Sequence, residues 1–267
     1  MASDRLASLK LRTGLLGTGN RKLWLAVLAV GTSLSCTRGV ESLQDPPNAV
    51  VVTTSGAWAS MIYLARTDSG IIAIDLGWTG AEAALERGTR RLDATPADIR
   101  YAFITHAHRN HIGGWQVVRG AHFVLGLEEI PYFTGAAQYV GLVPSSAERV
   151  SETARPKAEE ISVIPVSRDT AFALGADTVW AFPIPGHTLG SVAYLFRGVL
   201  FAGDAVNYRP MAGFQGARPE MSDDPARSRA SVAALWERLD STRARVVCSA
   251  HAKCGFNTSE LRRSLLK

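Results

Sequence analysis

The sequence is poor in cysteine and has no long apolar stretch. Three cysteines among 267 residues are too few for a scaffold held together by disulfides. The apolar run at residues 23–34 (LWLAVLAVGTSL) falls short of the roughly 20 residues that a membrane-spanning helix needs. Hydrophobic residues make up 46% of the chain and charged residues 20%, a balance typical of a globular protein and not of a disordered chain.

Positive charge is also scarce outside the N-terminus. Residues 1–35 hold five basic residues and one acidic residue, so they contribute +4 of the formal net charge of +5. The chain from Cys36 onward therefore carries only +1. Because nucleic-acid binding depends on clustered positive charge, we expect a small-molecule substrate and no nucleic-acid partner.

Residues 1–35 resemble a bacterial export signal. An Arg-Lys pair precedes the apolar run 23–34, which has about the length of the apolar core of a signal peptide. A Ser-Cys pair ending at Cys36 is similar to a lipoprotein cleavage site, although Ser33 stands where leucine is usual. We expect a signal peptide, a periplasmic protein, and membrane attachment if Cys36 is lipidated. A buried N-terminal helix is the alternative.

After the signal, we expect a polar tether at residues 36–48 and one domain at 49–267. Short runs rich in β-branched residues predict strands, and apolar residues at helical spacing predict helices. Residues 126–160 are mixed and suggest a helix and a flap over the site. The expected strands are residues 49–54, 60–66, 70–77, 99–105, 121–126, 161–166, 170–174, 178–184, 190–196, 199–206 and 244–251. One expected helix begins with a capping Thr79, and a second begins at Gly113 and Gly114. A third has Pro225 in its first turn, and a fourth begins with a capping Ser259.

The order of these elements predicts the architecture. Each half of the domain consists of strands, a helix, a strand and a helix. Two sheets packed together, with helices on both outer faces, would satisfy this order. The fold class is therefore α/β, and no internal linker divides the domain.

Five of the six histidines follow predicted strands. Open α/β sheets build their sites at such strand ends. His122 is the exception, and we expect it to be an ordinary hydrogen-bonded residue. The others lie in the motif THAHRNHIGG (His106, His108, His111), in PGHT (His187) and at the end of the last strand (His251), and Asp204 lies in GDA after another strand.

These residue types suggest a metal centre. His106 and His108 are two positions apart, so their rings can point the same way, and His187 would complete a face of three nitrogens. Zinc in catalytic sites takes three protein ligands and keeps a fourth position for water, whose pKa it lowers to about 7. His111 and His251 point to a second ion, with Asp204 able to bridge the two.

The set of motifs resembles the metallo-β-lactamase superfamily. IDLG at 74–77, THAHRNHIGG, PGHT at 185–188, GDA at 203–205 and the final histidine run through about residues 50–255. The resemblance implies an αββα sandwich with the site at one edge of two mixed sheets. It places His106, His108 and His187 on a first metal, and Asn110, His111 and His251 on a second, with Asp204 between them. Asp75 would be a buried carboxylate near the site, and Thr188 would support a ligand from outside the metal's own coordination sphere.

Asn110 departs from the superfamily motif, which has aspartate at this position (HxHxDH). An amide is nearly the same shape as a carboxylate, but it is neutral, binds metal weakly and accepts no proton. We expect a weaker second site. Three outcomes stay open: an enzyme with one zinc ion, an enzyme with two and a weak second site, and a binding protein that has lost hydrolysis.

Asp204 narrows the expected chemistry. The resemblance associates a bridging aspartate with glyoxalase-like and lactonase-like hydrolases, whereas the β-lactamases usually have Cys or Ser there. We therefore expect an exported hydrolase that uses metal-bound hydroxide on a small ester, thioester, lactone or amide, with Asp204 and Asn110 as the residues nearest the reaction. The alternatives are a β-lactamase, a non-catalytic binding protein and an iron-dependent oxidoreductase.

Two cysteines, Cys248 and Cys254, bracket His251. In an oxidising compartment they could form a disulfide that closes the loop carrying this ligand. A metal-bound thiolate and a buried free cysteine are the alternatives.

Overall fold

The chain consists of two units, Met1–Ser35 and Cys36–Lys267. In the computed structural model, the described residues all belong to the second unit, and they are 40–43, 50–55, 60–139, 155–209, 211–239, 243–252 and 254–266. The expected signal peptide and Cys36 lie outside them. The range 36–48, interpreted from the sequence as a tether, contains strand β1 (Val40–Ser42), which pairs with β2. Part of this range therefore belongs to a sheet.

One sheet of the described residues has seven strands in sequence order, β1 to β7. Neighbours from β1 to β4 are antiparallel, and neighbours from β4 to β7 are parallel, so the sheet is mixed. After β1, its strands are β2 (Val50–Ser55), β3 (Ser60–Thr67), β4 (Gly70–Ile74), β5 (Ile99–Phe103), β6 (His122–Gly126) and β7 (Ser162–Val166).

The other large sheet has the order β15-β14-β11-β10-β9-β8. It is also mixed, because β11 and β14 are parallel while its other neighbours are antiparallel. Its strands are β8 (Thr170–Leu174), β9 (Asp177–Pro183), β10 (Val192–Phe196), β11 (Val199–Phe201), β14 (Val246–Cys248) and β15 (Cys254–Phe256). A separate two-stranded sheet pairs β12 (Val206–Arg209) with β13 (Gly213–Gly216).

The described α-helices are short except for α5. No helix among the described residues is both long and apolar enough to span a membrane. The α-helices are α1 (Glu82–Arg90), α2 (Arg109–Ile112), α3 (Ile130–Phe133), α5 (Pro225–Arg238) and α6 (Ser259–Leu265), and the 3₁₀ turns are η1 (Pro96–Asp98), η2 (Trp115–Val118), η3 (Leu127–Glu129), η4 (Ala158–Glu160), η5 (Gly203–Ala205) and η6 (Pro219–Met221).

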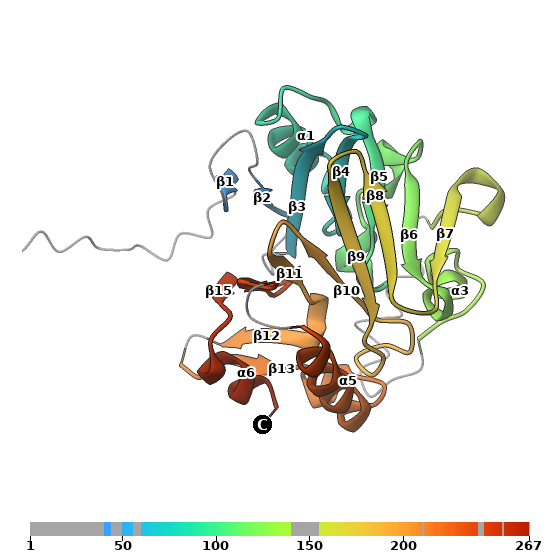
Figure 1. Ribbon diagram of the computed structural model, residues 1–267. Helices are drawn as coiled ribbons and strands as arrows, with labels where there is room; N and C mark the ends of the chain where they lie inside the picture. The colour runs from blue at the N-terminus through green and yellow to red at the C-terminus, as the bar shows by residue number, and fades with distance from the viewer. Residues whose placement is uncertain are drawn as a thin grey trace, which may run out of the picture. The chain divides into compact units, whose positions relative to one another are not determined.

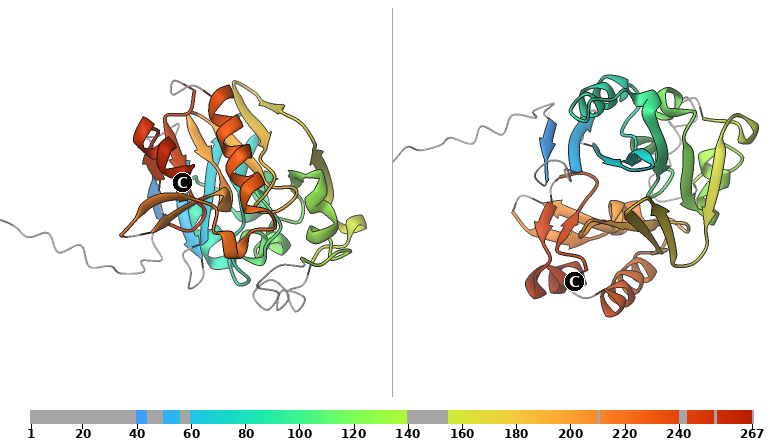
Figure 2. Two further views of the ribbon diagram at one scale, coloured as in Figure 1. Left: turned by 90° about the horizontal axis from the view of Figure 1, so that it is seen from below. Right: turned by 45° about the horizontal axis from the view of Figure 1, so that its top comes forward.

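The core has three layers of buried side chains. Alternate side chains of strand β3 belong to two of these layers. Tyr63 and Ala65 face the second sheet, while Ile62 and Leu64 face the layer that includes α1. A third layer joins the second sheet to α5 and α6. Figure 2 (right) shows α1 outside one sheet and α5 and α6 outside the other, and Figure 1 labels the strands between them. The predicted αββα sandwich of two mixed sheets is therefore confirmed.

Two predicted helix starts are wrong in detail, and a third segment forms a 3₁₀ turn. The N-cap of α1 is Ala81 and not Thr79, and that of α6 is Thr258, whose hydroxyl accepts a hydrogen bond from the Leu261 amide. The segment expected to be helical from Gly113 and Gly114 is the 3₁₀ turn η2, whose N-cap is Gly114, and the short helix α2 precedes it inside the histidine motif. Gly113 follows α2, and a Cβ there would lie 1.9 Å from the carbonyl carbon of Trp78. The two backbones can approach this closely only at a glycine.

Candidate metal centre

The predicted site residues lie just after the C-terminal ends of strands. Strands β4 and β5 are parallel neighbours in one sheet, and β11 and β14 are parallel neighbours in the other. Each pair therefore delivers its following loops to one edge of its sheet. Asp75 follows β4, the segment with His106, His108 and His111 follows β5, His187 follows β9, Asp204 follows β11, and His251 follows β14.

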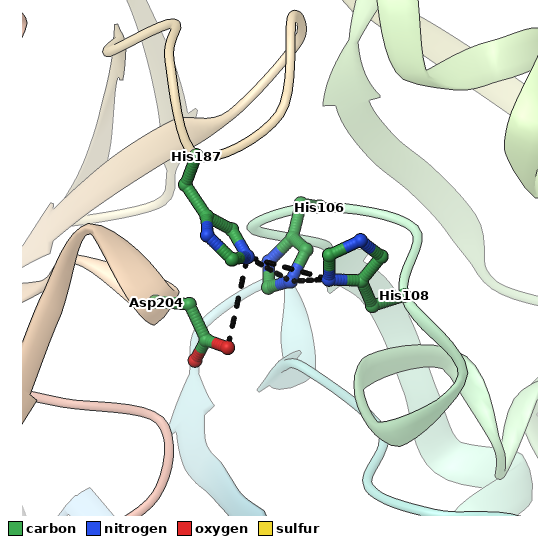
Figure 3. Close-up of side chains that lie close together, drawn as sticks. All are labelled: His106, His108, His187 and Asp204. Carbon is green, nitrogen blue, oxygen red and sulfur yellow. Dashed lines mark hydrogen bonds and ion pairs between the residues drawn. The ribbon is translucent and has the colours of Figure 1, made fainter. Parts of the chain in front are cut away.

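Three imidazole nitrogens of the first cluster face one another (Figure 3). Nε2 of His106 lies 3.0 Å from Nδ1 of His108 and 3.2 Å from Nε2 of His187. The remaining pair, His108 Nδ1 and His187 Nε2, is 3.3 Å apart. Zinc–nitrogen bonds of about 2.0–2.1 Å in a tetrahedral arrangement separate neighbouring nitrogens by about 3.3 Å. The three rings therefore fit a zinc ion, and Asp204 Oδ2 lies on the same side, 3.7 Å from His187 Nε2.

The three facing nitrogens of this cluster are not satisfied by one another. In a neutral imidazole, each ring nitrogen is either a donor or an acceptor. Among three mutually facing nitrogens, at least two must therefore be of the same kind. A central cation removes this conflict because it binds three lone pairs at once. This conflict is independent support for a metal-binding role.

Burial keeps these histidines neutral. Loss of solvent, reinforced by the charge of His111, holds the pKa of His106 well below its ordinary value. Loss of solvent and the charge of His187 do the same to the pKa of His108. Burial lowers the pKa of His187 to about 4, against the opposing effect of Asp204. All three rings are therefore unprotonated at pH 7, the state that metal ligation requires.

A second cluster combines His111, Asp204 and His251, whose ligand atoms lie within 4.8 Å of one another. Oδ1 of Asp204 is 3.7 Å from Nε2 of His111 and 3.2 Å from Nε2 of His251. Among the described residues, neither His111 Nε2 nor Asp204 Oδ1 has a hydrogen-bond partner, although both atoms are buried. Such atoms are rare without an ion or a water molecule. The second cluster can therefore also hold a cation, and Asp204 is common to both groups.

Asn110 lies at the edge of the second cluster. Its Nδ2 is 2.9 Å from Nε2 of His251. Its backbone carbonyl accepts a hydrogen bond from the Ser60 hydroxyl, which joins the motif to the start of β3. Asn110 thus lies beside the second cluster, where its side-chain amide donates a hydrogen bond to His251.

Asp75 orients histidines of both clusters. Its carboxylate accepts a hydrogen bond at 2.8 Å from His111 Nδ1, so that Nε2 of this ring points toward Asp204. It also accepts hydrogen bonds from the backbone amide and the hydroxyl of Thr105. The Thr105 hydroxyl lies 3.1 Å from His106 Nδ1. Partners of this kind fix the ring orientation of metal-binding histidines.

The second cluster has a different charge state from the first. Burial by itself lowers the pKa of His111, but the charges of Asp75 and Asp204 outweigh it and raise this pKa to about 10. Burial likewise raises the pKa of Asp204, but its interactions with the neighbouring His251 and His111 outweigh it and hold this pKa well below its ordinary value. In the metal-free protein, His111 is therefore a cation at pH 7 and Asp204 an anion.

A buried carboxylate next to the first cluster did not stand out in the sequence. Glu129 is fully buried and accepts hydrogen bonds from the backbone amides of Ala107 and Gly190. It follows another glutamate in a turn-like segment, a pattern typical of a solvated surface. Only its burial, which depends on residues far away in the chain, sets it apart.

The remaining predicted residues have structural partners. His122 lies outside both clusters and contacts the Ser162 hydroxyl at 2.8 Å, as expected of an ordinary histidine. Thr188 is buried, and its hydroxyl lies 2.8 Å from that of Ser191 in the loop after His187. Cys248 and Cys254 form a disulfide across β14 and β15. The disulfide interpretation is confirmed, and the metal-thiolate alternative is wrong.

The fold and the histidine clusters define a member of the metallo-β-lactamase superfamily. The sequence profile described as Metallo-beta-lactamase superfamily matches residues 55–251, which is well over half of the chain. The chain therefore belongs to this superfamily. The predicted family is confirmed.

The chain is similar to hydrolases of several kinds. It is 24% identical over 169 residues to the probable polyketide biosynthesis zinc-dependent hydrolase BaeB of Bacillus velezensis, a match that covers 62% of this chain and 64% of BaeB. The match thus spans less than two thirds of that relative. The dizinc quorum-quenching lactonase AidC has the same fold, with a TM-score of 0.61 and 17% identity over 82% of this chain and 93% of AidC. So does the subclass B3 metallo-β-lactamase BJP-1 of Bradyrhizobium japonicum, with a TM-score of 0.56 and 22% identity over 76% of this chain and 75% of BJP-1.

Proposed function

We propose that this chain is an exported metallo-hydrolase that cleaves a small ester, thioester, lactone or amide with zinc held by His106, His108 and His187. The observation that carries the proposal is the convergence of three neutral ring nitrogens at 3.0–3.3 Å. Catalytic zinc typically has three protein ligands and a water molecule, whereas structural zinc has four protein ligands. Three converging nitrogens, with the carboxylate of Asp204 shared with the second cluster, fit the catalytic kind. A zinc ion here would lower the pKa of a water molecule to about 7 and polarise the substrate carbonyl.

Asp204 would orient the attacking water molecule. Its carboxylate lies next to His187 and His251 and is ionised, so it accepts a hydrogen bond from the water and orients a lone pair toward the carbonyl carbon. Asn110 is neutral and takes up no proton. In this proposal Asp204 therefore orients the nucleophile, and Asn110 acts by holding His251. The same aspartate favours esters, thioesters and lactones over β-lactams, since the superfamily's β-lactamases usually have Cys or Ser there.

We further propose that the second site binds metal more weakly than the first. It offers one carboxylate and two histidines. One of these histidines, His111, is positively charged at pH 7 in the metal-free protein and must lose a proton before it can bind metal. The amide of Asn110 donates to the Nε2 of His251 that a metal would need. Two dications side by side also require compensating negative charge, and an aspartate in place of Asn110 would supply it.

Export and membrane attachment are supported by two features. The N-terminus has the basic pair, the apolar run and the Ser-Cys junction of a lipoprotein signal. The disulfide between Cys248 and Cys254 is typical of an oxidising compartment such as the periplasm.

The proposal is tested by metal content and turnover of the full chain. Zinc-loaded protein is assayed on a panel of esters, thioesters, lactones and β-lactams, alongside His187→Ala and the matched control His122→Ala. We expect turnover of an ester-like substrate, its loss in His187→Ala, and no change in His122→Ala.

Other results point to other functions. Turnover confined to β-lactams would make the protein a lactamase, and bound iron without hydrolysis would favour an oxidoreductase. Bound zinc without any turnover would favour a binding protein, and no bound metal would contradict the metal centre itself.

A further inference from the structure

We propose that Glu129 is a positioning residue that joins the two loops carrying the histidines of the first cluster. The inference builds on the proposed zinc site and adds a residue that none of the site motifs contains. Glu129 ends the 3₁₀ turn η3 after β6, away from the strand-end loops that supply the histidines. Its side chain is fully buried.

The two carboxylate oxygens of Glu129 bind different loops. Oε2 accepts a hydrogen bond at 2.7 Å from the backbone amide of Ala107, the residue between His106 and His108. Oε1 accepts one at 3.1 Å from the backbone amide of Gly190, in the turn that follows His187. One side chain therefore holds both the backbone between His106 and His108 and the turn that follows His187.

A third partner of Glu129 extends this contact to the ring of His108. The hydroxyl of Tyr139 donates a hydrogen bond to Oε2 of Glu129. The ring of Tyr139 packs edge to face against His108, with 4.5 Å between the centroids. Tyr139 also stacks on Tyr132 at 4.2 Å. Glu129 thus influences both the backbone and the ring orientation of His108.

The packing around Glu129 leaves little room for another arrangement. A Cβ on Gly190 would lie 2.7 Å from Cγ of Glu129, and a Cβ on Gly126 would lie 1.9 Å from the carbonyl oxygen of Gly190. The turn after His187 therefore lies directly on the segment that carries Glu129, without a side chain in between. The carboxylate of Glu129 supplies the hydrogen-bond acceptors where these two segments meet.

Replacing the carboxylate by an amide would break the arrangement. An ionised carboxylate accepts hydrogen bonds at both oxygens, whereas a glutamine has one oxygen and one NH₂ group. In Glu129→Gln, the NH₂ group must face either the Ala107 or the Gly190 amide, which are both donors. One of the two loops would lose its anchor. Changes to such supporting partners typically weaken metal binding about 10–100-fold.

The experiment measures metal affinity and ligand geometry, so that it does not depend on turnover. The full-length protein, Glu129→Gln and Tyr139→Phe are titrated with Zn²⁺ against a chelator, and the visible spectrum of Co²⁺ in the first cluster is recorded. Asp177→Asn is the matched control, because it removes the partly buried carboxylate that pairs with Arg197 at the start of β9, the end of that strand away from His187. Tyr139→Phe removes one hydrogen bond to Glu129 and keeps the ring on His108.

We expect Glu129→Gln to lose about 10–100-fold in zinc affinity at the first cluster and to shift the Co²⁺ spectrum. Tyr139→Phe should change the zinc affinity and the Co²⁺ spectrum in the same direction but by less. Asp177→Asn should leave both the affinity and the spectrum unchanged. If Glu129→Gln folds with unchanged affinity and spectrum, or weakens both clusters equally, the inference is wrong. If it does not fold, an unaltered Tyr139→Phe overturns the inference instead. A natural chain that binds no zinc would contradict the proposed metal site itself, a result distinct from all of these.

Discussion

The side-chain amide of Asn110 lies 2.9 Å from Nε2 of His251. The same nitrogen of His251 is 3.2 Å from Oδ1 of Asp204, so it faces the interior of the second cluster. A metal bound there would have to replace this hydrogen bond. In return it would gain at best a neutral amide oxygen, a weaker ligand than a carboxylate. The contact between Asn110 and His251 is thus the structural reason to expect unequal metal sites.

The charge of Asp75 should stabilise the metal-free protein through His111. In Asp75→Asn, the charged ring of His111 loses its buried partner at 2.8 Å. Removing one member of a buried pair typically costs about 3–5 kcal/mol. We expect a loss of roughly 3 kcal/mol in the unfolding free energy at pH 7, measured by chemical denaturation. Asp75 has a positive φ of 55°, which asparagine also tolerates, so the substitution leaves the backbone unstrained and removes the charge together with one acceptor oxygen. A loss below about 0.5 kcal/mol, the usual range of a surface substitution, would contradict this role.

Zinc binding should displace a histidine proton at one cluster and not at the other. The comparison is made at pH 6, where a zinc-bound water with a pKa of about 7 is still mostly protonated. The pKa of His187 is about 4, so at pH 6 this ring is already neutral before zinc binds. The pKa of His111 is about 10, so zinc at the second cluster must displace one proton. Calorimetric titration in two buffers of different ionisation enthalpy counts these protons, and His187→Ala isolates the second cluster.

The same pKa values predict opposite pH dependences. Between pH 7 and 5, the first cluster should keep a nearly constant zinc affinity, since its histidines stay largely neutral and a zinc-bound water with a pKa of about 7 stays largely protonated. The second cluster should lose about tenfold in affinity for each unit by which the pH falls, because one proton competes with the metal. Release of a full proton from the first cluster at pH 6, or a flat profile for the second, would contradict the assigned charge states.

The disulfide should support the second cluster specifically. Cys248 and Cys254 close the short loop that carries His251, whereas the histidines of the first cluster lie on other loops. We expect the double variant Cys248→Ala/Cys254→Ala to lose about 2 kcal/mol of stability through loop-closure entropy. Zinc titration should reveal weaker binding at the second cluster and unchanged binding at the first. An equal loss at both clusters would indicate a general effect on the fold.

The placement of the site residues after strand ends could be predicted from the sequence, because strands depend on local patterns. Strand ends follow from β-branched runs and turn residues, and the histidines and Asp204 follow those ends directly. The two sheets and their covering helices follow from the same patterns. The strands β12, β13 and β15 escaped prediction because they are short and lie in segments without a clear apolar period.

The contacts that distinguish this site could not be read in the same way. Glu129 and Gly190 are separated by 61 positions, and Asn110 and His251 by 141. Such pairs form only when the two sheets pack, and no local pattern encodes them. The helix α2 has only four residues, too few for an apolar period to predict it.

Asn110 should make the second metal site weak while the first stays complete. The direct test is the zinc stoichiometry and the two zinc affinities of the natural chain, Asn110→Asp and Asn110→Ala. The aspartate restores a negative ligand, and the alanine control removes the hydrogen bond to His251 without adding charge.

We predict one tightly bound zinc ion per natural chain, with the second bound at least about tenfold more weakly. Asn110→Asp should strengthen the second site by about tenfold or more, the lower end of what supporting residues of metal sites contribute, and leave the first unchanged. Asn110→Ala should not strengthen the second site to this extent. Two zinc ions of equal affinity in the natural chain, unaffected by Asn110→Asp, would contradict the account.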